Sequence, residues 1–263
     1  MMQKGVILEN NFLSKVIFRI DFTTILKIAG DKKEAAEDFQ KKVFDKFPNV
    51  EIVHQNNLNI NIGIGSKTPE KVTNKSNICW IFRNDNGNKE ISLTADNLIF
   101  ICYNESYIGF KSFLNDVMLI INALKDYLPF ELKFLGLRYI NQIDDSEIND
   151  NIDIFINNSL SNSNIINDLN DDEKLSQIFN KLSFQKDKYF LNLQYGFFNT
   201  QFPDPNGTKN FILDYDCVNN QIKSIDEVEK NLKEMNRIIF EKFEYSIKDT
   251  FIEKMGEKND STD

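Results

Sequence analysis

Alternation of apolar and polar residues predicts most of the strands in this chain. The clearest case is residues 58–64, where leucine or isoleucine alternates with asparagine or glycine, the pattern of a sheet with one solvated face. Other short apolar runs bounded by turn residues also predict strands. These runs are residues 14–22, 78–83, 90–95, 98–103, 133–143, 189–199 and 211–218. Short links between the consecutive strands indicate an antiparallel arrangement.

Apolar residues three and four positions apart predict three helices. The first covers residues 31–47, with Asp31 as its N-cap. The second, residues 107–128, is the longest apolar segment with the helical period. The third begins after Ser224, with Glu227 in the position that completes a capping box.

The order of these elements predicts an α+β fold. We expect a curved, mainly antiparallel sheet with long helices packed on one face, because the strands do not alternate with helices as in doubly wound folds. Strand 133–143 is apolar on both sides around Gly136, which is typical of a central strand. We expect a single domain over residues 1–263, and the polar link 144–181 is the place where it would subdivide.

The net charge of the chain argues against a nucleic-acid partner. It is −9 at pH 7, although the hydrophobic content of 41% is that of an ordinary globular protein. Phosphate backbones repel an acidic surface, and four arginines are few for phosphate recognition. We therefore expect another protein, or a second copy of this chain, as the partner.

No segment indicates export or a membrane. No run approaches the roughly 18 apolar residues that cross a bilayer. The first residues lack an apolar stretch after a basic region, so no signal peptide is expected. The predicted location is the cytoplasm.

Reactive groups are too scarce for most catalytic constellations. The three cysteines are far apart without a CxxC pair, and His54 is the only histidine. A Ser-His-Asp or Cys-His arrangement would have to use that one residue, which has no nucleophile motif beside it. No phosphate-binding glycine loop occurs, since Gly63-Ile64-Gly65 lacks the third glycine and a following helix. No cofactor is expected.

The segment Gly136-Leu137-Arg138-Tyr139-Ile140-Asn141 resembles the GLRYxN signature of a sporadically distributed prokaryotic protein family without a settled activity. The start of the helix before it, residues 107–113, and the segment 213–216 also resemble that family, in the family's order. The link 144–181 has no counterpart in it. The patchy distribution of the family implies a role in antiviral defence or in mobile elements.

Within this signature, Arg138, Tyr139 and Asn141 are the candidate binding residues. Arg138 lies in a strand expected to be covered on both sides, and a buried guanidinium is costly unless it is paired. It would therefore contact either an anionic ligand or a carboxylate of the core. Both readings remain open from the sequence.

Asp214 and Asp216 are the candidate metal ligands. Alternation along the predicted strand places both carboxylates on one face, and such pairs bind Mg²⁺ in phosphoryl-transfer enzymes. A metal site would need a third carboxylate that the sequence does not place. Alternatively, one of the two is the partner of Arg138.

These observations favour a non-enzymatic protein- or ligand-binding accessory factor. The alternative is a metal-dependent phosphoryl-transfer or nuclease-like enzyme that uses Asp214 and Asp216. A third reading is a small-ligand sensor with a cavity near Arg138.

Overall fold

The computed structural model describes most of the chain. The described residues are 12–29, 34–61, 71–144, 152–161, 165, 168–170 and 172–255. The predicted cap Asp31 and the segment Gly63-Ile64-Gly65 lie outside them.

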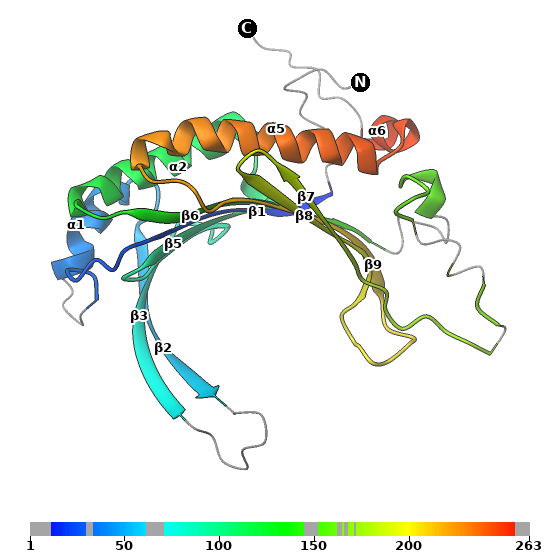
Figure 1. The fold of residues 1–263 in the computed structure, drawn as a ribbon, viewed down its shortest axis with the longest axis horizontal. Coiled ribbons are helices and arrows are strands. Elements are labelled where there is room, and N and C mark those ends of the chain that lie inside the picture. Colours follow the sequence, from blue (N-terminus) through cyan, green and yellow to red (C-terminus); the bar gives the residue numbers. More distant parts are fainter. Residues whose placement is uncertain are drawn as a thin grey trace, which may run out of the picture.

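Nine strands form one sheet in which every neighbouring pair is antiparallel. They are Leu13–Phe22 (β1), Asn49–Asn61 (β2), Lys71–Arg83 (β3), Lys89–Leu93 (β4), Asn97–Tyr103 (β5), Leu132–Ile143 (β6), Asn180–Lys186 (β7), Tyr189–Asn199 (β8) and Lys209–Asn219 (β9). The order across the sheet is β2-β3-β4-β5-β1-β6-β9-β8-β7 (Figure 1).

Strand β1 connects the two halves of the sheet. It pairs with β5 on one side and with β6 on the other. Among the described strands, the meander β2 to β5 therefore meets β6 to β9 through β1. As predicted, the strand that carries the GLRYxN segment, β6, lies inside the sheet and not at its edge.

Four α-helices are described: Glu34–Val43 (α1), Phe110–Leu124 (α2), Val228–Ser246 (α5) and Asp249–Met255 (α6). Figure 1 shows α1, α2 and α5 on the same side of the sheet. Ser224 caps the turn before α5 as predicted, since its hydroxyl accepts a hydrogen bond from the backbone N–H of Asp226. No helix in these ranges is long and apolar enough to cross a bilayer.

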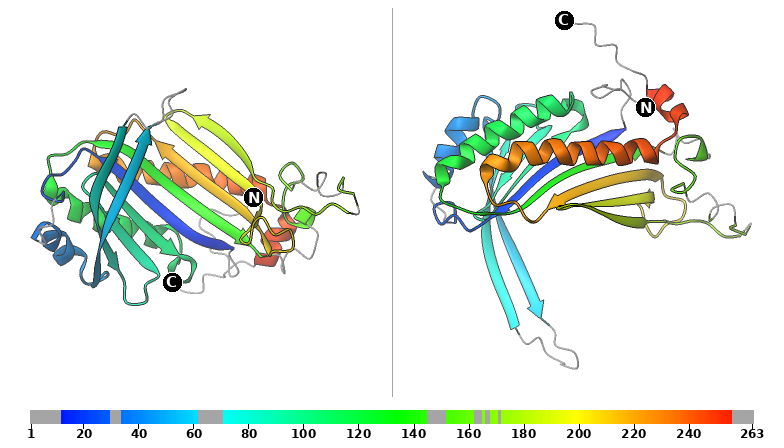
Figure 2. Two further views of the ribbon diagram at one scale, coloured as in Figure 1. Left: turned by 90° about the horizontal axis from the view of Figure 1, so that it is seen from below. Right: turned by 45° about the horizontal axis from the view of Figure 1, so that its top comes forward.

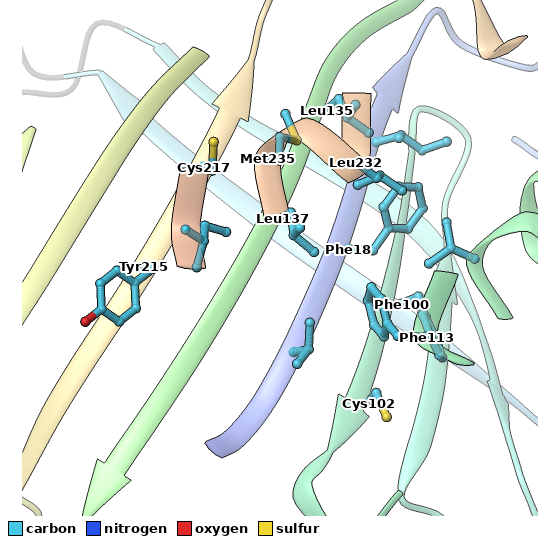
Figure 3. Packing of buried hydrophobic residues seen from close by; sticks show 14 of the residues in the cluster. Phe18, Phe100, Cys102, Phe113, Leu135, Leu137, Tyr215, Cys217, Leu232 and Met235 are labelled. Carbon is cyan, nitrogen blue, oxygen red and sulfur yellow. The ribbon is translucent and has the colours of Figure 1, made fainter. Parts of the chain in front are cut away.

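The hydrophobic core lies between the sheet and these helices. Phe100 of β5 stacks on Phe113 of α2, with ring centroids 5.3 Å apart. Figure 3 shows Leu232 and Met235 of α5 among the buried residues near Leu135 of β6. On the central strands, the side chains that point toward the helices are the ones that alternation removes from water.

The α+β class and the antiparallel sheet are confirmed, but the finer description is not well supported. The described α-helices span only 7 to 19 residues, and the sheet is not strongly curled. Two strands also differ from their predictions. β2 begins at Asn49, before the predicted 58–64, and β7 occupies residues 180–186 at the end of the polar link.

Candidate functional site

The two faces of β6 separate the three candidate binding residues. Leu135 and Leu137 are fully buried on the helix side. Because side chains alternate along a strand, Tyr139 and Asn141 follow them to that side, whereas Arg138 points to the opposite one. The structure therefore does not bring Arg138, Tyr139 and Asn141 together in one site.

Tyr139 and Asn141 are held by contacts inside the protein. The Tyr139 hydroxyl donates to Oδ1 of Asn236 on α5 at 2.8 Å and lies 3.1 Å from the hydroxyl of Tyr107. Burial raises the pKa of Tyr139 well above its ordinary value. Asn141 is buried, and its Nδ2 donates to the carbonyl oxygen of Leu213 at 3.3 Å. These contacts join β6 to its helix layer and to β9.

Arg138 forms a two-pronged ion pair with Asp214 across the β6–β9 pairing. Its Nε and Nη2 donate to the two carboxylate oxygens at 2.8 and 2.5 Å. The Arg138 side chain is 40% exposed and that of Asp214 only 6%. The hydrogen bonds to Asp214 raise the pKa of Arg138 above its already high ordinary value. Of the two alternatives for Arg138, the structure shows the carboxylate partner.

Asp216 lies beside this pair on the same face, as alternation predicts. It is directly opposite Arg138 on β6 and Asn192 on β8. No described cation lies within 4.0 Å of its carboxylate. Burial raises the pKa of Asp216, and this effect outweighs the nearby Arg138 charge, which acts in the opposite direction.

A second charged pair lies two strands from Asp216, on β1. Arg19 donates to both carboxylate oxygens of Asp21, at 2.8 and 2.9 Å, and its guanidinium lies 5.3 Å from the ring centroid of Phe134. That ring covers Gly136, where an added Cβ would approach it to 2.9 Å. The glycine of the GLRYxN segment therefore leaves room for Phe134 on this face.

Apolar side chains surround these charges and remain partly exposed. They belong to the central strands and alternate with buried core residues. They are Ile17, Ile99, Ile101, Ile140, Ile212 and Val218. Together with the two charged pairs and Asp216, they form what we call the helix-free face, because the described helices lie on the other side of the sheet (Figure 2).

The described side chains offer little for covalent or metal chemistry. They contain no group of three or more His, Cys, Asp or Glu residues placed to hold a metal ion. Burial raises the pKa of Cys102 to about 11 and that of Cys217 to about 12, so these thiols stay protonated at neutral pH. His54 lies exposed on the edge strand β2.

The sequence alone predicts Arg138, Asp214 and Asp216 as candidate site residues, but it does not predict which other residues lie beside them on this face. Arg19 and Asp21 belong to a strand that was predicted, and their alternation with buried residues placed them opposite the core. Their position near Arg138 depends on the pairing of β1 with β6, which no local pattern reports. A scan of protein-family models finds no match to the chain, and a search of curated proteins finds none either.

Proposed function

We propose that this chain is a non-enzymatic binding protein and that another protein docks on its helix-free face. The observation that carries this proposal is the set of partly exposed apolar side chains that lie among the charged pairs on the central strands β5, β1, β6 and β9. Central strands normally lose such side chains to a second layer, and a contiguous exposed apolar patch is typical of an interaction surface.

The charges of this face favour a protein over a nucleic acid. Arg19 is paired with Asp21 and Arg138 with Asp214, while Arg83 contacts both Glu51 and Glu90. Each arginine of the described face is thus neutralised by a carboxylate, and the net charge of the chain is −9. Phosphate binding needs unpaired cations, whereas paired charges among apolar residues are common in protein interfaces.

The resemblance of Gly136 to Asn141 to the GLRYxN signature supplies the biological setting of the proposal. By that resemblance, the protein serves as an accessory factor of a cytoplasmic defence or mobile-element system. Of the three residues first considered for binding, Arg138 is the one that the proposal places at the interface.

Site-specific photo-crosslinking tests the docking surface. A benzoylphenylalanine would replace Ile17 or Ile140 on the helix-free face, or Phe44, which is exposed beyond the end of α1, as the control. Irradiation of cells of the native host should give a discrete adduct from the first two positions only. The mass of the adduct distinguishes a second copy from another protein. Adducts from Phe44 alone, or from no position, would contradict the proposal.

The alternative of metal-dependent phosphoryl transfer rests on the adjacent carboxylates Asp214 and Asp216. Both oxygens of Asp214 are held by Arg138, so metal binding would require that ion pair to open. A thermal-shift titration with Mg²⁺ or Mn²⁺ tests it. Stabilisation that is abolished by Asp214→Ala and by Asp216→Ala would favour the enzyme and count against the binding protein.

A further inference from the structure

One carboxylate of the helix-free face, that of Asp216, forms no ion pair with a described residue. Asp21 and Asp214 on this face each form an ion pair with an arginine. Asp216 is partly buried between β6 and β8 but forms none. Arg138 is directly opposite it and is hydrogen-bonded to Asp214. The charges of Arg138, Lys181 and Arg19 act on Asp216 without an ion pair to it.

The position of Asp216 makes its charge costly in the free protein. A carboxylate that loses part of its hydration without gaining a hydrogen-bonded cation is destabilised. The raised pKa of Asp216 has the same cause. A cation brought by a partner would meet a carboxylate that is already partly dehydrated, where a charge-assisted hydrogen bond is strong.

The residues around Asp216 define what else such a partner must carry. Val218 is its next neighbour on the same face of β9, and Phe190 of β8 is directly opposite Val218. Ile140 of β6 lies diagonally across on the other side. All three are apolar and at least partly exposed. A cation that reaches Asp216 therefore passes between apolar surfaces, which favours a side chain within a polypeptide over a free hydrated ion.

We propose that Asp216 is the recognition residue for a lysine or arginine side chain on a partner protein, and that apolar side chains flank this cation in the partner segment. The inference rests on the proposed docking of a protein on the helix-free face and adds the chemistry of the partner. Electrostatic complementarity of this kind sets specificity more than total affinity.

A displayed library of random peptides tests the inference. The library would first be depleted on the Asp216→Lys variant, whose fold is checked by circular dichroism, and then selected on the wild-type chain. We expect the recovered peptides to share a lysine or arginine beside apolar residues. A synthetic copy should bind Asp216→Asn about tenfold or more weakly, whereas Asp216→Glu, which keeps the charge, should retain more of the affinity.

The matched control is Asp226→Asn. This aspartate precedes α5 and its side chain is 77% exposed, so the substitution should leave peptide binding unchanged. Peptides that lose binding with Ile17→Glu but contain no basic residue would overturn the role of Asp216 and leave the docking surface intact. Peptides indifferent to Ile17→Glu would overturn both proposals. A selection that yields no peptide dependent on Asp216 also overturns the inference.

Discussion

Asp214 and Asp216 lie two residues apart on one face of β9, yet their different surroundings give them different roles. Asp214 is almost fully buried and is neutralised by Arg138, so it belongs to the framework of the sheet. Asp216 forms no ion pair with a described residue, and burial raises its pKa more than the charges of Arg138, Lys181 and Arg19 lower it. A residue that costs stability without an internal benefit is typical of a functional position.

Asp216→Asn should therefore stabilise the free protein at neutral pH. The raised pKa of Asp216 means that the folded state holds its proton more tightly than the unfolded state. The ionised carboxylate thus costs stability above the folded-state pKa, and this cost disappears below the unfolded-state value. We expect the variant to melt up to about 2 °C higher at pH 7, with the difference vanishing as the pH falls below the ordinary aspartate pKa. Thermal melts across that range measure it, and a lower melting temperature at pH 7 would contradict the assignment.

The ion pair between Arg138 and Asp214 gives a second prediction. Arg138→Ala leaves a buried carboxylate without its cation, and we expect a loss of about 2 kcal/mol of unfolding free energy. Asp214→Ala leaves the more exposed arginine, which water can solvate, and should cost less. The double variant should be closer to the wild type than the sum of the single losses predicts. Urea unfolding measures this cycle, and strictly additive losses would show that the pair contributes no coupling.

At the scale of the elements, a buried carboxylate ties α2 to two other parts of the molecule. Asp116 of α2 accepts hydrogen bonds from Lys46 Nζ, beyond α1, at 2.6 Å and from Lys89 Nζ of β4 at 2.7 Å. Its side chain is 3% exposed. The pairing therefore sets how α2 lies over the meander.

Removing that carboxylate should loosen the helix from the sheet. Asp116→Ala leaves two lysines without their partner, but both are partly exposed and water can solvate them. We therefore expect an unfolding free energy lower by about 1 to 2 kcal/mol, mostly from the lost hydrogen bonds. Asp38→Ala is the control, because Asp38 pairs with Lys27 at the surface, where such a pair contributes little to stability. Chemical denaturation compares the two. Equal losses of unfolding free energy in the two variants would mean that the burial of Asp116 adds no stability.

The elements differ in how far the sequence predicts them, and the reason is the number of buried faces. β6 and β8 bury alternate residues under the helices, so their pattern is strong. β7 is an edge strand with mostly exposed residues, and only Leu182 and Phe184 mark its apolar side. A polar edge strand has the composition of a loop. For the site, alternation places Asp214 and Asp216 on one face. The register puts Asp216 opposite Arg138, and only the side-chain geometry shows that Arg138 binds the diagonal neighbour Asp214.

At the scale of the whole molecule, the described strands belong to one sheet, with one hydrophobic cluster against the helices. We therefore expect the chain to unfold in a single cooperative step, with a ratio of van't Hoff to calorimetric enthalpy of about 1. Differential scanning calorimetry tests this prediction. Two resolved transitions, with a boundary between residues 144 and 181, would instead support the subdivision that the polar link suggests.

The place of β1 between β5 and β6 has a consequence for synthesis on the ribosome. β1 emerges before either of its neighbours, and at about 5 to 20 residues per second β6 follows it roughly 6 to 24 s later. Until β6 has been synthesised, β1 lacks one of its two neighbouring strands. Val16, Phe18 and Ile20 of β1 are fully buried only in the completed fold. The nascent chain therefore exposes an apolar segment for several seconds, and we expect ribosome-associated chaperones to bind that segment.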